Sequence, residues 1–126
     1  MKLNPDCIRD ILLEVESHTH FNSALVIDVD KPNALFESYS WDEIAYHINQ
    51  CALSDLITGT QIFYDDGYAV IKDLSPDGHT FIANIRSKTH WAAIKKIAST
   101  VGSFALPVLQ QIATTYIQGR LPSNPV

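Results

Sequence analysis

The fold prediction rests on a helix signal, Ser40-Trp41-Asp42-Glu43-Ile44-Ala45-Tyr46-His47-Ile48. The Ser40 hydroxyl and the Glu43 carboxylate can each bond a free backbone amide at a helix start, as in a capping box. Apolar side chains then recur at helical spacing as far as Ala52, so we expect one buried face. The other face would present polar residues that are candidates for an interaction surface: Asp42, Glu43, Tyr46, His47, Asn49 and Gln50.

A hairpin signal follows this helix. The turn Asp65-Asp66-Gly67 separates two β-rich runs at 57–64 and 68–74, which predicts a β-hairpin. A helix followed directly by such a hairpin is typical of winged-helix domains. Residues 40–53 would then occupy the recognition-helix position, and the hairpin would form the wing. The usual separate helix before residue 40 is expected to be absent or very short.

The remaining elements are mostly helices. Asn4-Pro5 and Ser75-Pro76 each combine a capping residue with a proline suited to a first helical turn. Residues 24–29 are a predicted strand, and 35–39 a second, shorter one. Two further helices have predicted buried stripes made of Trp91, Ile94, Ala98 and Val101, and of Val108, Leu109, Ile112, Ala113 and Tyr116. We therefore predict a single α+β domain at 1–120, with a winged-helix-like core of helix, strand, helix and β-hairpin wing, additional C-terminal helices, and a flexible tail at 121–126.

Charge divides the chain into an acidic and a basic part. All fourteen acidic residues lie within 1–77, together with four basic ones, whereas 78–126 contain five basic residues and no acidic ones. Electrostatic fields select partners, so each part is expected to favour a different surface. The basic part supplies a candidate basic face made of Arg86, Lys88, Lys95 and Lys96. Lys95 and Lys96 are expected to point into solvent.

The charge pattern disfavours DNA at the recognition-helix position. Residues 40–55 contain three acidic residues and no lysine or arginine, and the predicted hairpin tip adds Asp65 and Asp66. Neutralisation of phosphates supplies most of the non-specific affinity for a duplex. We therefore expect this surface to repel nucleic acid.

No motif indicates catalysis, a metal or a cofactor. The five glycines do not cluster into a phosphate loop, and no nucleophile elbow, HExxH or paired-cysteine set occurs. His18 and His20 fit no common zinc spacing and are expected at a solvated helix end. Cys7 and Cys51 are expected to be buried free thiols. The prediction is that the protein is not an enzyme and holds no metal and no cofactor.

Several segments resemble a bacterial and phage family known as domain of unknown function 2513. The likeness covers nearly the whole chain and is carried by residues 6–16, 43–48, 56–57, 74–86, Trp91, Lys95-Lys96, 107–109 and 112–113. The chain departs from the family at 21–39, which is longer, and at Pro76, where the family tends to have tryptophan. The resemblance implies a cytosolic protein of winged-helix-like architecture, and it supplies no activity and no catalytic residue.

These observations favour a cytoplasmic protein-interaction module that acts without catalysis and without a membrane span. Its partner is an unknown protein, and a homodimer is one form of this hypothesis, because the acidic part of one copy could meet the basic part of another. The alternative is a DNA-binding winged-helix transcriptional regulator that uses the basic C-terminal helices or a noncanonical face. A minor alternative is an acidic DNA mimic that inhibits a host enzyme or host defence.

Overall fold

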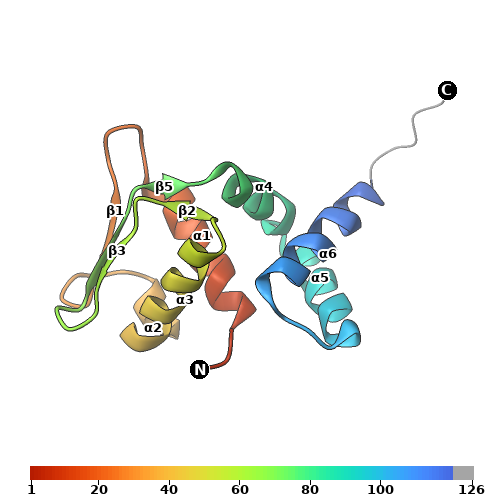
Figure 1. Ribbon diagram of the computed structural model, residues 1–126, viewed down its shortest axis with the longest axis horizontal. Coiled ribbons are helices and arrows are strands. Elements are labelled where there is room, and N and C mark those ends of the chain that lie inside the picture. The colour runs from red at the N-terminus through yellow and green to blue at the C-terminus, as the bar shows by residue number, and fades with distance from the viewer. Residues whose placement is uncertain (121–126) are drawn as a thin grey trace.

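Short strands and helices alternate along the first part of the chain, and three helices form the last part (Figure 1). The computed structural model describes residues 1–120, so the predicted tail at 121–126 lies outside the described residues. The elements are α1 (Pro5–His18), β1 (Leu25–Asp28), α2 (Leu35–Ser38), α3 (Trp41–Leu53), β2 (Ile57–Thr58), β3 (Gln61–Phe63), β4 (Tyr68–Ile71), β5 (Asp73–Leu74), α4 (Pro76–Ile85), α5 (Lys88–Val101) and α6 (Leu106–Gln118). This architecture confirms the predicted α+β class.

The helices begin where their capping residues predict. Asn4 Oδ1 accepts a hydrogen bond from the Asp6 amide at 3.0 Å, and Ser75 Oγ accepts one from the Gly78 amide at 2.9 Å. At the start of α3, Ser40 Oγ accepts from the Glu43 amide at 3.2 Å, and the Glu43 carboxylate reaches back to the Ser40 amide. The predicted capping box is therefore confirmed.

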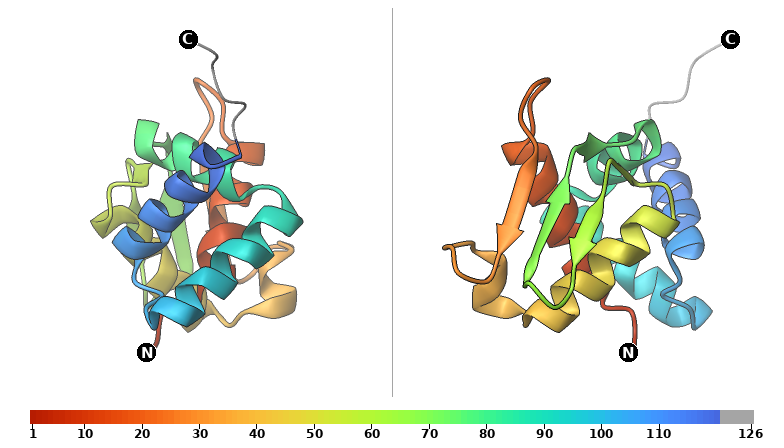
Figure 2. Two further views of the ribbon diagram at one scale, coloured as in Figure 1. Left: turned by 90° about the vertical axis from the view of Figure 1, so that its right-hand side faces the viewer. Right: turned by 60° about the vertical axis from the view of Figure 1, so that its left-hand side comes forward.

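The strands form two antiparallel sheets. In the three-stranded sheet the order is β1-β4-β3, which the right-hand view of Figure 2 shows as an orange, a green and a yellow-green strand. β2 and β5 form the second sheet. The β3–β4 and β2–β5 ladders belong to the predicted hairpin, but its first strand is interrupted at Gly59, whose φ of +61° takes the chain out of extended geometry. The hairpin is confirmed, with broken rather than continuous strands.

The predicted strand at 35–39 is wrong, because these residues form α2. The Asn33 side chain accepts a hydrogen bond from the Leu35 amide at 2.8 Å and turns the chain before the helix. A strand would have placed Leu35 and Phe36 on opposite faces, whereas the helix lets both pack against the core. α2 lies where a winged-helix arrangement has a separate helix before its recognition helix. That arrangement stays a prediction.

The hydrophobic core surrounds α1, which packs against α3, α4, β1 and β5. Its largest fully buried side chains include Ile8, Ile11, Leu12, Ile27, Ile44, Ile48, Ile71, Ile82 and Ile85. Cys7 and Cys51 also lie in this core, as predicted. Burial raises the pKa of the Cys7 thiol to about 12 and also raises the pKa of Cys51, so both remain unreactive thiols at neutral pH.

Polar side chains join α1 to the C-terminal helices. The Arg9 guanidinium donates to the backbone carbonyls of Ile85 and Arg86, with N···O distances of 2.9 and 2.6 Å. Asp6 Oδ1 accepts from Trp91 Nε1 at 2.8 Å and from Lys95 Nζ at 2.9 Å. Partial burial by itself would raise the pKa of Asp6, but these two hydrogen bonds and the Lys95 charge hold it below its ordinary value.

We expect Asp6→Asn to lower the free energy of unfolding at neutral pH by at most about 1 kcal/mol, because the ion pair is partly exposed. The lowered pKa means that the carboxylate stabilises the fold above its ordinary value of 3.8. This contribution is lost as the pH falls through the lowered pKa. Urea unfolding at a series of pH values should therefore show the difference narrowing in acid. Asp66→Asn, at the exposed hairpin tip, is the control, and a difference that is constant with pH would contradict the assignment.

His47 is buried, which corrects the prediction that it lies on the exposed face of its helix. Its Nε2 accepts from the Asn4 amide at 2.8 Å, and its Nδ1 lies 2.7 Å from the Glu43 carbonyl oxygen. The carbonyl can only accept, so Nδ1 carries the proton. The imidazole thus connects the first turn of α3 to the cap of α1, a role that a helical wheel cannot reveal.

His47→Leu should lower the free energy of unfolding by about 1–3 kcal/mol, because the Asn4 amide loses its partner at a partly buried position. Chemical denaturation measures this directly. His79→Leu is the matched control, since His79 is exposed on α4 and should tolerate the change. Equal losses in the two variants would show that the His47 hydrogen bonds contribute nothing specific.

Candidate interaction surfaces

The exposed side of α3 is acidic and polar. Asp42 is exposed, and the other predicted members of this face apart from His47 are partly exposed: Glu43, Tyr46, Asn49 and Gln50. The structure therefore brings five of the six predicted residues to one surface. It adds Leu53, whose relative exposure of 70% was not anticipated, because it ends the helix where no other element packs.

The tip of the β3–β4 hairpin lies beside the start of α3. Trp41 Nε1 donates to the Tyr64 carbonyl at 3.0 Å, and the exposed Asp65 and Asp66 follow directly. Between residues 32 and 71 the chain contains no lysine or arginine. The surface made by α3 and this tip thus offers carboxylates and no cation from its own segment, so it is unfavourable for a polyphosphate.

The predicted basic face is divided by ion pairs with α1. Arg86 binds Glu16, and Lys95 binds Asp6 while its Nζ lies 5.6 Å from the centre of the Trp91 ring. Lys95 is therefore partly exposed, as an already paired charge. Lys88 and Lys96 are exposed and form no ion pair within residues 1–120. Two of the four predicted residues remain available to a partner as unpaired charges.

The structure also shows the surroundings of His18 and the grouping of residues that could bind a metal. His18 Nε2 lies 3.2 Å from a Glu14 carboxylate oxygen, one turn earlier on α1. Across residues 1–120, no three side chains among His, Cys, Asp and Glu are grouped so that they could hold a metal ion. Over the same residues, no helix combines the length and the apolar character needed to cross a bilayer.

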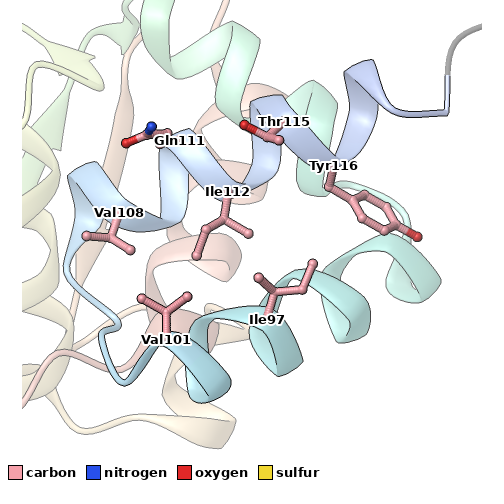
Figure 3. A pocket seen from close by; sticks show the side chains of 7 residues that line it. All are labelled: Ile97, Val101, Val108, Gln111, Ile112, Thr115 and Tyr116. Atoms are coloured by element: carbon pink, nitrogen blue, oxygen red, sulfur yellow. The ribbon is translucent and has the colours of Figure 1, made fainter.

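An apolar groove between α5 and α6 is the surface that sequence reasoning missed (Figure 3). It has a volume of about 450 Å³ and is lined by Ile97, Val101, Val108, Gln111, Ile112, Thr115 and Tyr116. Figure 3 shows Ile97 and Val101 of α5 pointing toward Val108 and Ile112 of α6. Val101 was predicted in a buried stripe but is 63% exposed, and Ile97 is 39% exposed. The open side of this helix pair has no other element against it among the described residues.

The chain forms this groove by reversing direction after α5. Gly102 adopts the left-handed conformation, with φ of +87°, and ends the helix. Pro107 then stands in the first turn of α6, as the sequence predicts. Val101 and Val108 therefore lie near the turn, and the rings of His90 and Tyr116 meet at the far end with centroids 5.5 Å apart. The sequence did contain one indication of this groove: Ile97 and Val101 are apolar and one helical turn apart, in addition to the buried residues Ile94 and Ala98.

The groove has a positively charged margin. The guanidinium carbon of Arg120 lies 5.4 Å from the Tyr116 ring centre, and Arg120 Nη1 is 3.3 Å from the Tyr116 hydroxyl oxygen. Lys96 is exposed next to Ile97 on α5. No carboxylate occurs on either helix, because Asp77 is the last acidic residue of the chain.

Comparisons with known proteins agree with the sequence resemblance. The model of a family described as "Hypothetical protein (DUF2513)" matches residues 2–104. An uncharacterized protein of Haemophilus influenzae is 28% identical over 123 residues, an alignment that covers 96% of this chain and 99% of the relative. No solved structure matches the chain. Because the family match covers most of its length, this chain belongs to the DUF2513 family, a domain family of unknown function.

Proposed function

We propose that this protein is a non-catalytic module that binds another protein through the groove between α5 and α6. The observation that carries the proposal is a continuous apolar surface, on which Val101 is 63% exposed and Ile97 is 39% exposed. Exposed apolar grooves bordered by polar residues are candidates for interaction sites. The polar border is supplied here by Gln111 and Thr115 of α6.

Within residues 1–120, the core leaves part of the Ile97 and Val101 side chains exposed. Ile94 and Ala98 of α5 already fill the interface with the rest of the core, together with Leu109 and Ala113 of α6, and all four are fully buried. Ile97 follows Ile94 by three residues and Val101 follows Ala98 by three, so both lie along the edge of that stripe. Their apolar surface therefore adds little to folding and is available to a binding partner.

The chemistry of the groove supports binding rather than catalysis. A catalytic site needs a nucleophile, an acid or a base aimed at a shared point. The lining offers one amide, one hydroxyl and one phenol among aliphatic side chains: Gln111, Thr115 and Tyr116. The two thiols of the chain lie elsewhere, in the core, with raised pKa values.

A DNA-binding regulator is the second candidate, and the order of the elements favours it. α2, α3 and the β3–β4 hairpin follow one another as in the predicted winged-helix arrangement. Its weakness is charge, since α3 and the hairpin tip present Asp42, Glu43, Asp65 and Asp66. The same acidic surface is what motivates the minor alternative, a mimic of DNA.

Photocrosslinking tests the proposed surface. A benzophenone amino acid at position 101 should capture a protein partner in a lysate of the cells that naturally produce this protein. The same residue at position 53 is the matched control, because Leu53 is equally apolar and 70% exposed but lies on α3. Capture from position 53 and not from position 101 would reject the groove as the contact surface.

A duplex titration separates the two candidate functions. We expect no binding of a mixed-sequence duplex at about 10 µM protein in low salt, because α3 carries carboxylates where phosphate contacts would be needed. Fluorescence anisotropy is a suitable measurement, with Lys88→Glu/Lys96→Glu as the comparison. Micromolar binding that weakens steeply with salt would support the regulator, and its loss in the double variant would place the contact on α5.

A further inference from the structure

Two basic side chains, Lys96 and Arg120, lie near the α5–α6 groove. On an α-helix successive residues are about 100° apart, so Lys96 lies beside Ile97 on the side away from the buried residues Ile94 and Ala98. It is therefore an exposed cation on the outer side of α5, about 100° around the helix from the groove residue Ile97. Arg120 stands over the Tyr116 ring. With His90 against the same tyrosine, each titratable group placed beside the groove is neutral or cationic.

The dimensions of the groove suit one helix. α5 and α6 run antiparallel, and the lining on α6 extends from Val108 to Tyr116. At 1.5 Å per residue this stretch is about 12 Å long, which is roughly two turns of a helix laid alongside. A helix in such a groove would contribute apolar residues at positions i, i+3 or i+4, and i+7.

A second copy of this chain is a poor occupant. Symmetric pairing of two grooves would bring Lys96 and Arg120 near their own counterparts, and like charges oppose association. The carboxylates of Asp6 and Glu16, which could have met these cations, are already paired with Lys95 and Arg86 within the chain. In a symmetric pair of grooves, complementary charge therefore does not come from the second copy, and a different protein is the better source.

We propose that the groove between α5 and α6 takes an amphipathic helix of another protein whose apolar stripe is bordered by acidic residues. This inference rests on the proposed function and specifies its partner. The apolar stripe would cover Ile97, Val101 and Ile112, and the acidic border would meet Lys96 and Arg120. Charge pairs at such a rim contribute modestly one by one, but they select between partners that are equally apolar.

Three model peptides test this partner class. Each is a fluorescent helix of about 14 residues with leucines at i, i+3, i+4 and i+7. The first has glutamate at all bordering positions, the second has lysine there, and the third is a scrambled form of the first. We expect the acidic peptide to bind at least about tenfold more tightly than the lysine peptide in low salt, with the scrambled peptide weakest.

Two variants assign the binding to the groove. Val101→Glu should weaken the acidic peptide by at least about tenfold, since it places a carboxylate in the apolar lining. Leu53→Glu is the matched control and should leave binding unchanged. Both positions are largely exposed, at 63% and 70%, so both variants should fold, as circular dichroism will verify. Lys96→Glu should reduce the preference for the acidic peptide.

The outcomes distinguish the inference from the function on which it rests. Equal binding of the acidic and lysine peptides would overturn the acidic partner while leaving an apolar protein-binding groove. Binding that Val101→Glu does not change would also overturn the inference, and so would the absence of binding by any peptide. In either case, crosslinking at position 101 would be the remaining test of the proposed function. A dimer in light scattering that Val101→Glu dissociates would place a second copy in the groove and reject the proposed occupant.

Discussion

The contact between Arg9 and the end of α4 fixes the relation between the two parts of this molecule. Its side chain is only 12% exposed, and the guanidinium donates to the carbonyls of Ile85 and Arg86. Carbonyls at a helix C-terminus have no partner within their own helix, so a buried cation there satisfies both sides. α4 is thereby held against α1, and α5 and α6 follow from it. Arg9 thus helps to place the helices that carry the groove, although it is far from them in the sequence.

The division of charge along the chain acquires a different meaning in the folded protein. From the sequence, an acidic part and a basic part suggested attraction between two copies. In the structure, α1 supplies Asp6 and Glu16 to Lys95 and Arg86, so much of that attraction operates within one chain. Fewer cations remain for a partner than the count of residues indicates. Those that remain in the basic part are Lys88, Lys96 and Arg120, which lie on α5 or just after α6. The charge asymmetry of the chain thus becomes a local preference near the groove.

Local signals were predictable, and burial from distant contacts was not. Caps at Asn4, Ser40 and Ser75 and the hairpin turn act through neighbouring backbone, so their residues alone suffice. His47 was misplaced because its partner, the Asn4 amide, comes from another helix. The residues around Gly78 do not indicate that glycine is needed there. A Cβ at this position would lie 2.0 Å from the Leu56 carbonyl oxygen, so the close approach of α4 to that loop requires glycine. Val101 was misjudged for the opposite reason, since a periodic stripe cannot tell which of its members another element covers.

The surface of α3 with the hairpin tip and the surface of α5 with α6 are built on different elements, which Figure 1 shows to the left and to the right. They also differ in charge, because one presents Asp42, Asp65 and Asp66 and the other is bordered by cations. An acidic partner drawn to the groove is repelled from α3, and a basic partner experiences the reverse. Electrostatics therefore selects the face before any close contact forms, and apolar contacts then determine how long the partner stays.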